Sequence, residues 1–163
     1  MKTIFVVDDN DVNLVTAKRT LEGEYIVRTM PSAMKMLAVI EKIKPDLILL
    51  DIEMPEMDGF AAISKLKENK STADIPVIFL TAYETDEIEA LGLEHGAIDF
   101  ITKPFSAPVL LNRIAHHLKI EELLQKRMKK LQHLTDSILE VVADMVESRD
   151  SITGGHIAVN ERE

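Results

Sequence analysis

Short apolar runs alternate five times with amphipathic stretches from residue 1 to about residue 105, and this alternation restricts the possible folds more than any other feature. Four of the runs are nearly continuous aliphatic or β-branched residues, as in parallel strands that are covered on both faces. The runs lie at Thr3–Val7, Tyr25–Arg28, Leu47–Leu50, Val77–Leu80 and Ala97–Ile101. The pattern predicts an α/β fold with a five-stranded, doubly wound parallel sheet that binds ligands at the carboxyl ends of its strands.

Helix signals fill the stretches between the runs. Polar residues that favour the first position of a helix are expected to cap four of the helices, at Asp11, Ser32, Asp86 and Ser106. The first of these helices carries Val12, Val15 and Leu21, and Gly23 is expected to end it.

The sequence from Ser106 to about Arg149 predicts one extended C-terminal helix, because it has no glycine and its single proline, Pro108, lies in the first turn. A heptad seam runs along it, at Leu124, Met128, Leu131, Thr135, Ile138, Val142 and Met145. The alternative is an amphipathic helix that packs on its own domain. Since five strand–helix units already complete that domain, we expect a homodimeric coiled coil or bundle through residues 120–146, and a break at residues 148–155.

Composition excludes several classes of protein. The chain has 19 Lys and Arg against 28 Asp and Glu, a net charge of -9, which is unfavourable for binding nucleic acid. It has no cysteine, which excludes disulfides, thiolate metal sites and cysteine nucleophiles. No apolar run approaches the ~20 residues of a membrane span, and Asp8 comes too early for a signal peptide. We expect a soluble, cytoplasmic protein with no nucleic-acid or membrane partner.

Carboxylates stand where two of the predicted strands end. Asp8 and Asp9 close the first strand, and Asp51 closes the third. Parallel strands bring their carboxyl ends to one edge of the sheet, so these acids are expected to converge. Clustered carboxylates repel one another unless a cation lies among them, and oxygen ligands without His or Cys favour Mg²⁺.

Two further strand ends carry groups that bind phosphoryl oxygens. Thr81 ends the fourth strand with a hydroxyl group, and Lys103 follows the fifth strand with an ammonium group. Each residue alone has an ordinary explanation, as a helix cap or a turn residue. Together with a metal, the four strand ends predict a site for a phosphoryl group.

These motifs resemble the receiver domain of bacterial two-component response regulators over residues 1 to about 120. The resemblance rests on Asp8-Asp9, on residues 51–59 (Asp51-Ile-Glu-Met-Pro-Glu-Met-Asp-Gly), on Thr81-Ala82 and on Lys103-Pro104-Phe105. It implies a flavodoxin-like sheet of strand order 2-1-3-4-5 and a cis peptide bond between Lys103 and Pro104.

The resemblance also assigns roles. Asp51 would be the phosphoacceptor, and Asp8, Asp9, Asp51 and the backbone carbonyl of Glu53 would hold Mg²⁺. Thr81 and Lys103 would bind phosphoryl oxygens, and Thr81 with Phe100 would form the switch. A sensor histidine kinase, a phosphotransfer protein or a small acyl phosphate would supply the phosphoryl group. Glu53 and Tyr83 are expected to flank the path of the water that later removes it.

Residues 138–156 resemble the opening of an HD-GYP domain, a metal-dependent phosphodiesterase acting on cyclic di-GMP. The pairs Arg149-Asp150, Thr153-Gly154 and Gly155-His156 carry the resemblance. Val159 stands in place of an arginine, Ile152 stands where some members have a metal-binding glutamate, and the His-Asp and Gly-Tyr-Pro motifs are absent. We therefore expect a receiver domain at 1–120, a coiled-coil-like linker helix at 121–147 and a truncated start of such an output domain at 148–163. The chain itself is not predicted to be an enzyme, whereas a longer protein would be a phosphodiesterase.

Three other functions compete with this one. A phosphate sink or an adaptor would use the receiver surface without an enzymatic output. A haloacid-dehalogenase-like phosphohydrolase also uses Asp and Mg²⁺, but its Asp-x-Asp motif does not match the adjacent pair Asp8-Asp9. A DNA-binding regulator would need a basic helix-turn-helix after the receiver, and the sequence has none.

Overall fold

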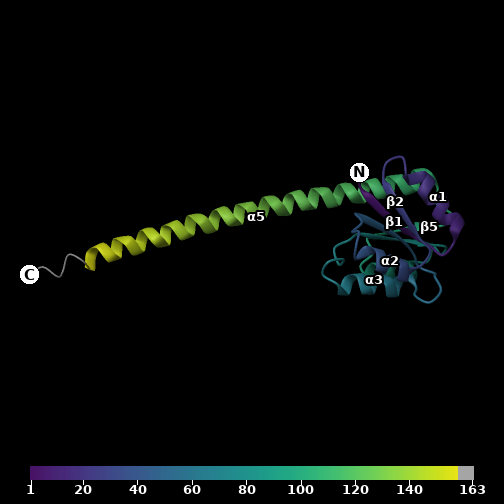
Figure 1. Cartoon of the computed structure of the whole chain (residues 1–163), viewed down its shortest axis with the longest axis horizontal. Helices are drawn as coiled ribbons and strands as arrows, with labels where there is room; N and C mark the ends of the chain where they lie inside the picture. Colours follow the sequence, from purple (N-terminus) through teal and green to yellow (C-terminus); the bar gives the residue numbers. More distant parts are fainter. Residues whose placement is uncertain (158–163) are drawn as a thin grey trace, which may run out of the picture. The chain divides into compact units, whose positions relative to one another are not determined.

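The computed structural model describes the backbone of residues 1–157 and the side chains of residues 1–153 (Figure 1). The chain divides into two compact units, the first from Met1 to Leu118 and the second from Lys119 onwards. Most of the motifs described above lie in the first unit, whereas His156 and Val159 lie outside the residues whose side chains are described.

Strands and helices alternate through the first unit. The strands are β1 (Thr3–Val7), β2 (Ile26–Met30), β3 (Leu47–Asp51), β4 (Val77–Thr81) and β5 (Asp99–Thr102). The helices between them are α1 (Asp11–Leu21), α2 (Ala33–Ile40), α3 (Gly59–Glu68) and α4 (Asp86–Glu94), and α5 (Ala107–Ile157) follows β5. All strand pairs are parallel and the order is β2-β1-β3-β4-β5, which confirms the predicted fold.

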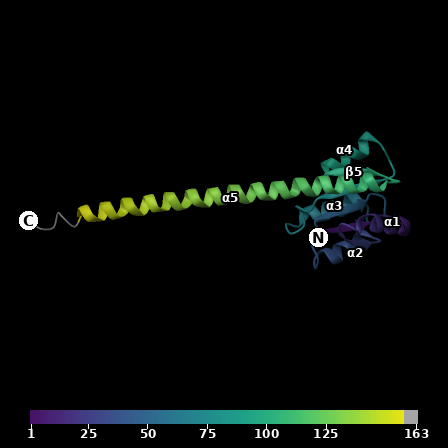
Figure 2. The ribbon, with the colours of Figure 1, turned by 90° about the horizontal axis from the view of Figure 1, so that it is seen from above.

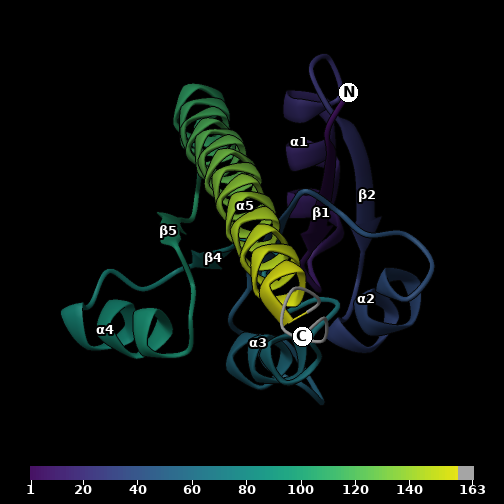
Figure 3. The same ribbon diagram turned by 90° about the vertical axis from the view of Figure 1, so that its left-hand side faces the viewer.

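Helices cover both faces of the sheet (Figure 3). On one face, α1 and the first turns of α5 pack on alternate strand residues such as Val6, Leu49 and Leu80. On the other face, α2 and α3 pack on the intervening residues, such as Phe5 and Leu50. Every residue of β3 and β4 is buried. Burial on both faces explains the near-continuous apolar runs that mark these strands in the sequence.

The residues that cap the helices agree with the sequence-based predictions only in part. Ser32 caps α2 as predicted, because its hydroxyl accepts a hydrogen bond from the amide of Lys35. The cap of α1 is Asn10 rather than Asp11, and the cap of α4 is Thr85 rather than Asp86. In both cases the neighbouring acid instead occupies the first turn, where its charge favours the positive end of the helix dipole.

The buried face of α1 also differs from the expected one. Leu14, Ala17 and Leu21 face the sheet, whereas Val12 and Val15 are exposed. The helix ends at Leu21, with Glu22 as its C-cap, so Gly23 lies beyond its end.

Helix α5 continues without interruption from Ala107, directly after Ser106, to Ile157 (Figure 2). The break expected at residues 148–155 is therefore wrong for the backbone to Ile157. Glycine costs a helix only about 1 kcal/mol relative to alanine, so a short glycine pair need not end one. The hydroxyl groups of Ser151 and Thr153 also donate to helix carbonyls, those of Ser148 and Arg149, at 2.9 Å each.

Over the described residues, none of the helices combines the length and the apolar run that crossing a membrane would need.

Candidate functional site

The carboxyl ends of β1 and β3 bring two buried aspartates together. Val7 pairs with Leu50, so Asp8 and Asp51 follow at the same edge of the sheet. Both carboxylates are buried, while the neighbouring Asp9 is exposed. One carboxylate oxygen from each of Asp8, Asp9 and Asp51 lies within 4.8 Å of the others. The predicted acidic pocket therefore forms.

Lys103 reaches the same pocket from the loop after β5. Its Nζ lies 2.8 Å from Oδ2 of Asp8 and 2.9 Å from Oδ1 of Asp51. The backbone amide of Lys103 donates to the carbonyl of Thr81 at 2.7 Å, which ties this loop to the end of β4. The peptide bond between Lys103 and Pro104 is cis, as predicted.

Burial and charge oppose each other in this pocket. Burial raises the pKa of Asp51 to about 7, and the neighbouring Asp8 adds to the rise, while Lys103 opposes it. Burial acts to lower the pKa of Lys103, but its hydrogen bonds to Asp8 and Asp51 outweigh burial and raise that pKa. One ammonium therefore faces three carboxylates. A divalent cation would add the positive charge that keeps Asp51 ionised at neutral pH.

Two asparagines that the sequence analysis did not single out hold Asp8 in place. The backbone amide of Asn10 donates to Oδ1 of Asp8 at 2.9 Å, and Nδ2 of Asn13 donates to Oδ2 at 3.0 Å. Asn10 follows Asp8 by two residues, a spacing typical of Asx turns, so this contact could be inferred from sequence. Asn13 gives no such signal, because its contact depends on how α1 leaves the sheet.

Gly59 allows the loop after Asp51 to close tightly. A Cβ atom at Gly59 would lie 2.6 Å from the backbone oxygen of Asp51, and the Gly59 amide donates to the carbonyl of Ile52 at 2.8 Å. Asp58 then caps α3 by accepting from the amide of Ala61. The glycine thus keeps the start of α3 against the strand that carries Asp51.

Thr81 ends β4, beside β3, and its side chain is buried. Its hydroxyl accepts a hydrogen bond from the amide of Tyr83 at 3.0 Å, so it is engaged by its own loop. A groove of about 660 Å³ next to the pocket is lined by Asp9, Glu53 and Tyr83 among others. The structure thus brings Glu53 and Tyr83 to the side of Asp9. Their influence on the lifetime of a phosphoryl group stays a prediction.

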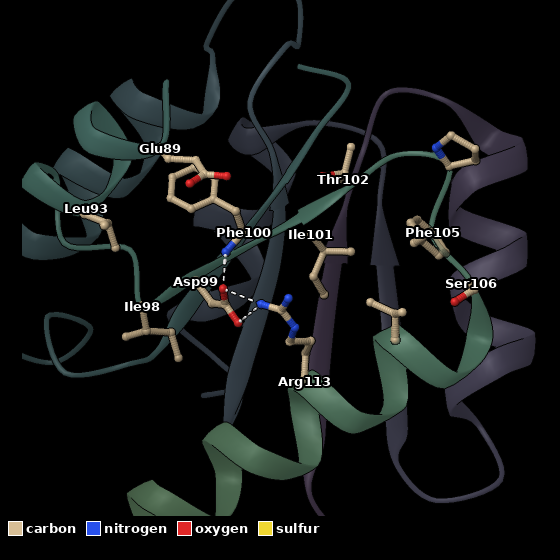
Figure 4. A pocket seen from close by; sticks show the side chains of 12 residues that line it. Glu89, Leu93, Ile98, Asp99, Phe100, Ile101, Thr102, Phe105, Ser106 and Arg113 are labelled. Atoms are coloured by element: carbon tan, nitrogen blue, oxygen red, sulfur yellow. Dashed lines mark hydrogen bonds and ion pairs between the residues drawn. The ribbon is translucent and has the colours of Figure 1, made fainter. Parts of the chain in front are cut away.

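Phe100 packs into the sheet side of α4. Its ring centroid lies 5.7 Å from that of Phe79, and a Cβ atom at Gly92 would lie only 2.2 Å from its Cζ. Gly92 was not identified from the sequence, although a glycine inside a predicted helix is a signal of close packing. The Phe100 ring is half-buried and points toward Glu89 of α4 at one side of a pocket of about 620 Å³ (Figure 4).

An ion cluster joins the start of β5 to α5, next to Phe100 (Figure 4). Nη1 of Arg113 lies 2.8 Å from both oxygens of Asp99, and Nε2 of His117 lies 2.9 Å from Oδ2. The amide of Phe100 also donates to Asp99. Burial acts to raise the pKa of Asp99, but these hydrogen bonds outweigh it and lower the pKa. The sequence analysis missed this cluster, because its residues lie 14 and 18 positions apart.

The arrangement suits transfer of a phosphoryl group to a carboxylate. Asp51 presents a carboxylate at the end of a buried strand, the Lys103 ammonium lies beside it, and three hard oxygen donors fit Mg²⁺. The sequence profile of the response regulator receiver domain matches residues 4–115, more than half of the chain. The chain belongs to the response regulator receiver family. Receiver domains bind Mg²⁺ at an acidic pocket and accept phosphoryl groups from histidine kinases or phosphotransfer proteins.

Known proteins are similar to this chain over different shares of its length and of their own. A Vibrio cholerae protein named as a probable cyclic di-GMP phosphodiesterase is 35% identical over 95% of the chain and 38% of its own length. Response regulator PleD of Caulobacter vibrioides is 34% identical over 98% of the chain and 35% of its own length. The chain thus spans little more than a third of these relatives. The solved structure of Vibrio cholerae chemotaxis protein CheY4 has a TM-score of 0.69 at 27% identity, covering 71% of this chain and 98% of that one.

Proposed function

We propose that this receiver domain accepts a phosphoryl group on Asp51 and passes the change through a dimerising C-terminal helix to an output domain. The observation that carries the proposal is the buried Asp51 carboxylate, 2.9 Å from the Lys103 ammonium and clustered with Asp8 and Asp9. A sensor histidine kinase, a phosphotransfer protein or a small acyl phosphate is the donor. We place the exchange in the cytoplasm, because such donors derive from intracellular ATP.

In the transfer, an oxygen of Asp51 forms a bond to phosphorus while the bond from phosphorus to the donor nitrogen or oxygen breaks. The donor leaves with that electron pair, and an acyl phosphate forms on Asp51. Mg²⁺, when bound by Asp8, Asp9, Asp51 and the backbone carbonyl of Glu53, neutralises charge on the phosphoryl oxygens.

Lys103 and Thr81 supply the remaining contacts. The Lys103 ammonium, held by Asp8 and Asp51, can turn to a phosphoryl oxygen that replaces the lost carboxylate charge. The Thr81 hydroxyl, which donates to the Tyr83 carbonyl at 3.3 Å, instead donates that hydrogen bond to another phosphoryl oxygen. Movement of Thr81 then frees space for Phe100, so the switch reaches α4, β5 and α5.

We further propose that, in a longer protein, the output is a cyclic di-GMP phosphodiesterase of the HD-GYP class. The similarity to the Vibrio cholerae protein extends over 95% of the chain, beyond the matched receiver residues 4–115. The resemblance of residues 138–156 to the opening of an HD-GYP domain supports the same output.

The experiment treats the chain with a small acyl phosphate and Mg²⁺ and records the intact mass. We expect a gain of one phosphoryl group, which Asp51→Asn and a metal chelator each abolish. Asp58→Asn is the matched control, because Asp58 is an exposed carboxylate near the site that caps α3. A gain that survives Asp51→Asn, or that is equal in chelator, contradicts the assignment.

A further inference from the structure

The second unit carries an apolar seam that the described residues leave uncovered. The six large apolar residues of the seam are all at least half exposed, from 50% for Val142 to 70% for Met128. The spacing of four and three residues keeps them on one side of the helix, where a second helix of the same period would cover them. The seam therefore predicts a partner with the same repeat, and a second copy of this chain has it.

The residues that flank the seam divide the helix into two parts. From Leu134 to Val146, the flanking positions are apolar: Leu134, Leu139, Val141 and Val146, each more than half exposed. Between residues 120 and 132 they are mainly polar: Gln125, Arg127 and Gln132. We call residues 134–146 the distal segment and residues 120–132 the proximal segment.

The flanks also distinguish the two possible orientations of a helix pair. In a parallel pair in register, each flanking residue before the seam meets the residue five positions later on the partner. That pairing sets Leu134 against Leu139 and Val141 against Val146, and in the proximal segment Arg127 against Gln132. An antiparallel pair overlapping on the same seam would set Gln132 against Leu139 and Gln125 against Val146. The parallel pair places all four apolar flanks of the distal segment against apolar flanks, whereas this antiparallel pair does so only for Leu134, which meets Leu134 of the second copy.

The proximal segment has a weaker seam as well. The heptad spacing puts Glu121 in the seam three residues before Leu124, so a parallel pair would bring two carboxylates together. Like charges at such a position oppose pairing, and the polar flanks add little apolar burial. The proximal segment begins at the end of the receiver unit, which ends at Leu118.

We infer that a second copy binds in parallel and in register, that the distal segment holds the two copies together permanently, and that the proximal segment is the part that opens or closes on phosphorylation. The last clause rests on the proposed phosphorylation of Asp51, whereas the first two do not.

Cysteine cross-linking tests the inference cleanly, because the full chain has no native cysteine. Single variants Ile138→Cys and Met145→Cys report the distal seam, Leu124→Cys reports the proximal seam, and Glu140→Cys is the outward-facing control. In the unphosphorylated chain, we expect Ile138→Cys and Met145→Cys to form symmetric disulfides about tenfold faster than Glu140→Cys. Efficient cross-linking at Thr135→Cys but not at Met145→Cys would instead show an antiparallel pair and overturn the inference.

The same variants test the regulation. With a small acyl phosphate and Mg²⁺, we expect the Leu124→Cys rate to change at least about threefold while the Ile138→Cys rate stays constant. The change should be lost when Asp51→Asn is added. A phosphorylated chain in which Leu124→Cys does not respond, or in which Ile138→Cys responds equally, contradicts the division into two segments. If the chain does not take up phosphate, the proposed function fails, and the contrast between Thr135→Cys and Met145→Cys still decides the orientation.

Discussion

At the scale of single residues, the position of the Phe100 ring depends on the missing side chain at Gly92. A Cβ atom at Gly92 would lie 2.2 Å from Cζ of Phe100 and 3.0 Å from Cδ2 of Phe79. Alanine favours a helix by about 1 kcal/mol over glycine, so an open site would be stabilised by this change. Here the crowding dominates, and we expect Gly92→Ala to lower the free energy of unfolding by about 1–3 kcal/mol.

Urea denaturation measures this effect, with Gly23→Ala as the control because a Cβ atom at Gly23 meets nothing within 4 Å. We expect Gly23→Ala to change the free energy of unfolding by less than about 0.5 kcal/mol. In a chain that already carries Phe100→Ala, the same Gly92→Ala change should cost much less free energy of unfolding than it does in the wild type. Equal losses in both backgrounds would show that the ring is not what crowds residue 92.

The residues of the pocket divide into those that sequence predicts and those that it does not. Asp8, Asp9, Asp51 and Lys103 follow from a topological rule, because parallel strands end at one edge of the sheet. Gly92 and Asn13 act through helices that cross the sheet at particular angles. Those angles depend on packing of the whole core, which a linear pattern does not contain.

At the scale of elements, the Asp99 cluster connects β5, the strand that carries Phe100, to helix α5. Arg113 contacts both oxygens of Asp99 at 2.8 Å, a geometry that favours a charge-assisted pair. Arg113 is half exposed, so solvent screens the pair. We expect a coupling of about 1 kcal/mol between Asp99→Asn and Arg113→Gln in a double-mutant cycle on unfolding.

The control cycle uses Asp74→Asn and Lys44→Gln, because that ion pair is 3.4 Å long and both side chains are largely exposed. We expect a coupling near zero there. A similar coupling in both cycles would mean that the Asp99 cluster is an ordinary surface pair.

The lowered pKa of Asp99 also predicts a dependence on pH. Because the folded pKa lies below the unfolded value of about 3.9, the stabilisation is fully present above that pH and is lost as pH falls through the folded pKa. Wild type should therefore lose more stability than Asp99→Asn when the pH is lowered from about 5 to about 2.5. Parallel stability curves for the two chains would contradict this assignment.

Element positions were more predictable than element ends. The five apolar runs predict the strands, since full burial leaves a strong signal in sequence. The ends depend on choices between neighbours of similar chemistry, such as Asn10 and Asp11 or Thr85 and Asp86. The predicted break after residue 147 was wrong for a related reason. Serine and threonine hydroxyls can interrupt a helix, but they can also donate hydrogen bonds to its backbone carbonyls, as Ser151 and Thr153 do here.

At the scale of the whole molecule, the exposed seam predicts association. Burying each large apolar side chain yields about 1.5–3 kcal/mol, so the seam favours a dimer at tens of micromolar chain. We expect sedimentation to give a dimer for wild type and a monomer for Leu131→Lys with Ile138→Lys. His133→Lys with Glu140→Lys is the control, because both residues are exposed on the side of the helix away from the seam. A monomeric wild type, with and without phosphate, would remove this route of signalling.

The central position of β3 determines which parts of the receiver domain open together. All of its residues are buried, and it lies between β1 and β4, so we expect its amides to exchange with solvent only when the whole unit unfolds. Helix α4 buries only Gly92 among its residues, and a segment with so little buried surface unfolds locally at low cost. We therefore expect Asp51 to lie in the last part of the unit to unfold, whereas the ring of Phe100 packs on α4, one of the first parts to unfold. A phosphoryl group on Asp51 would therefore be held by the most stable part of the unit, while the structural response to it would occur in one of the least stable parts.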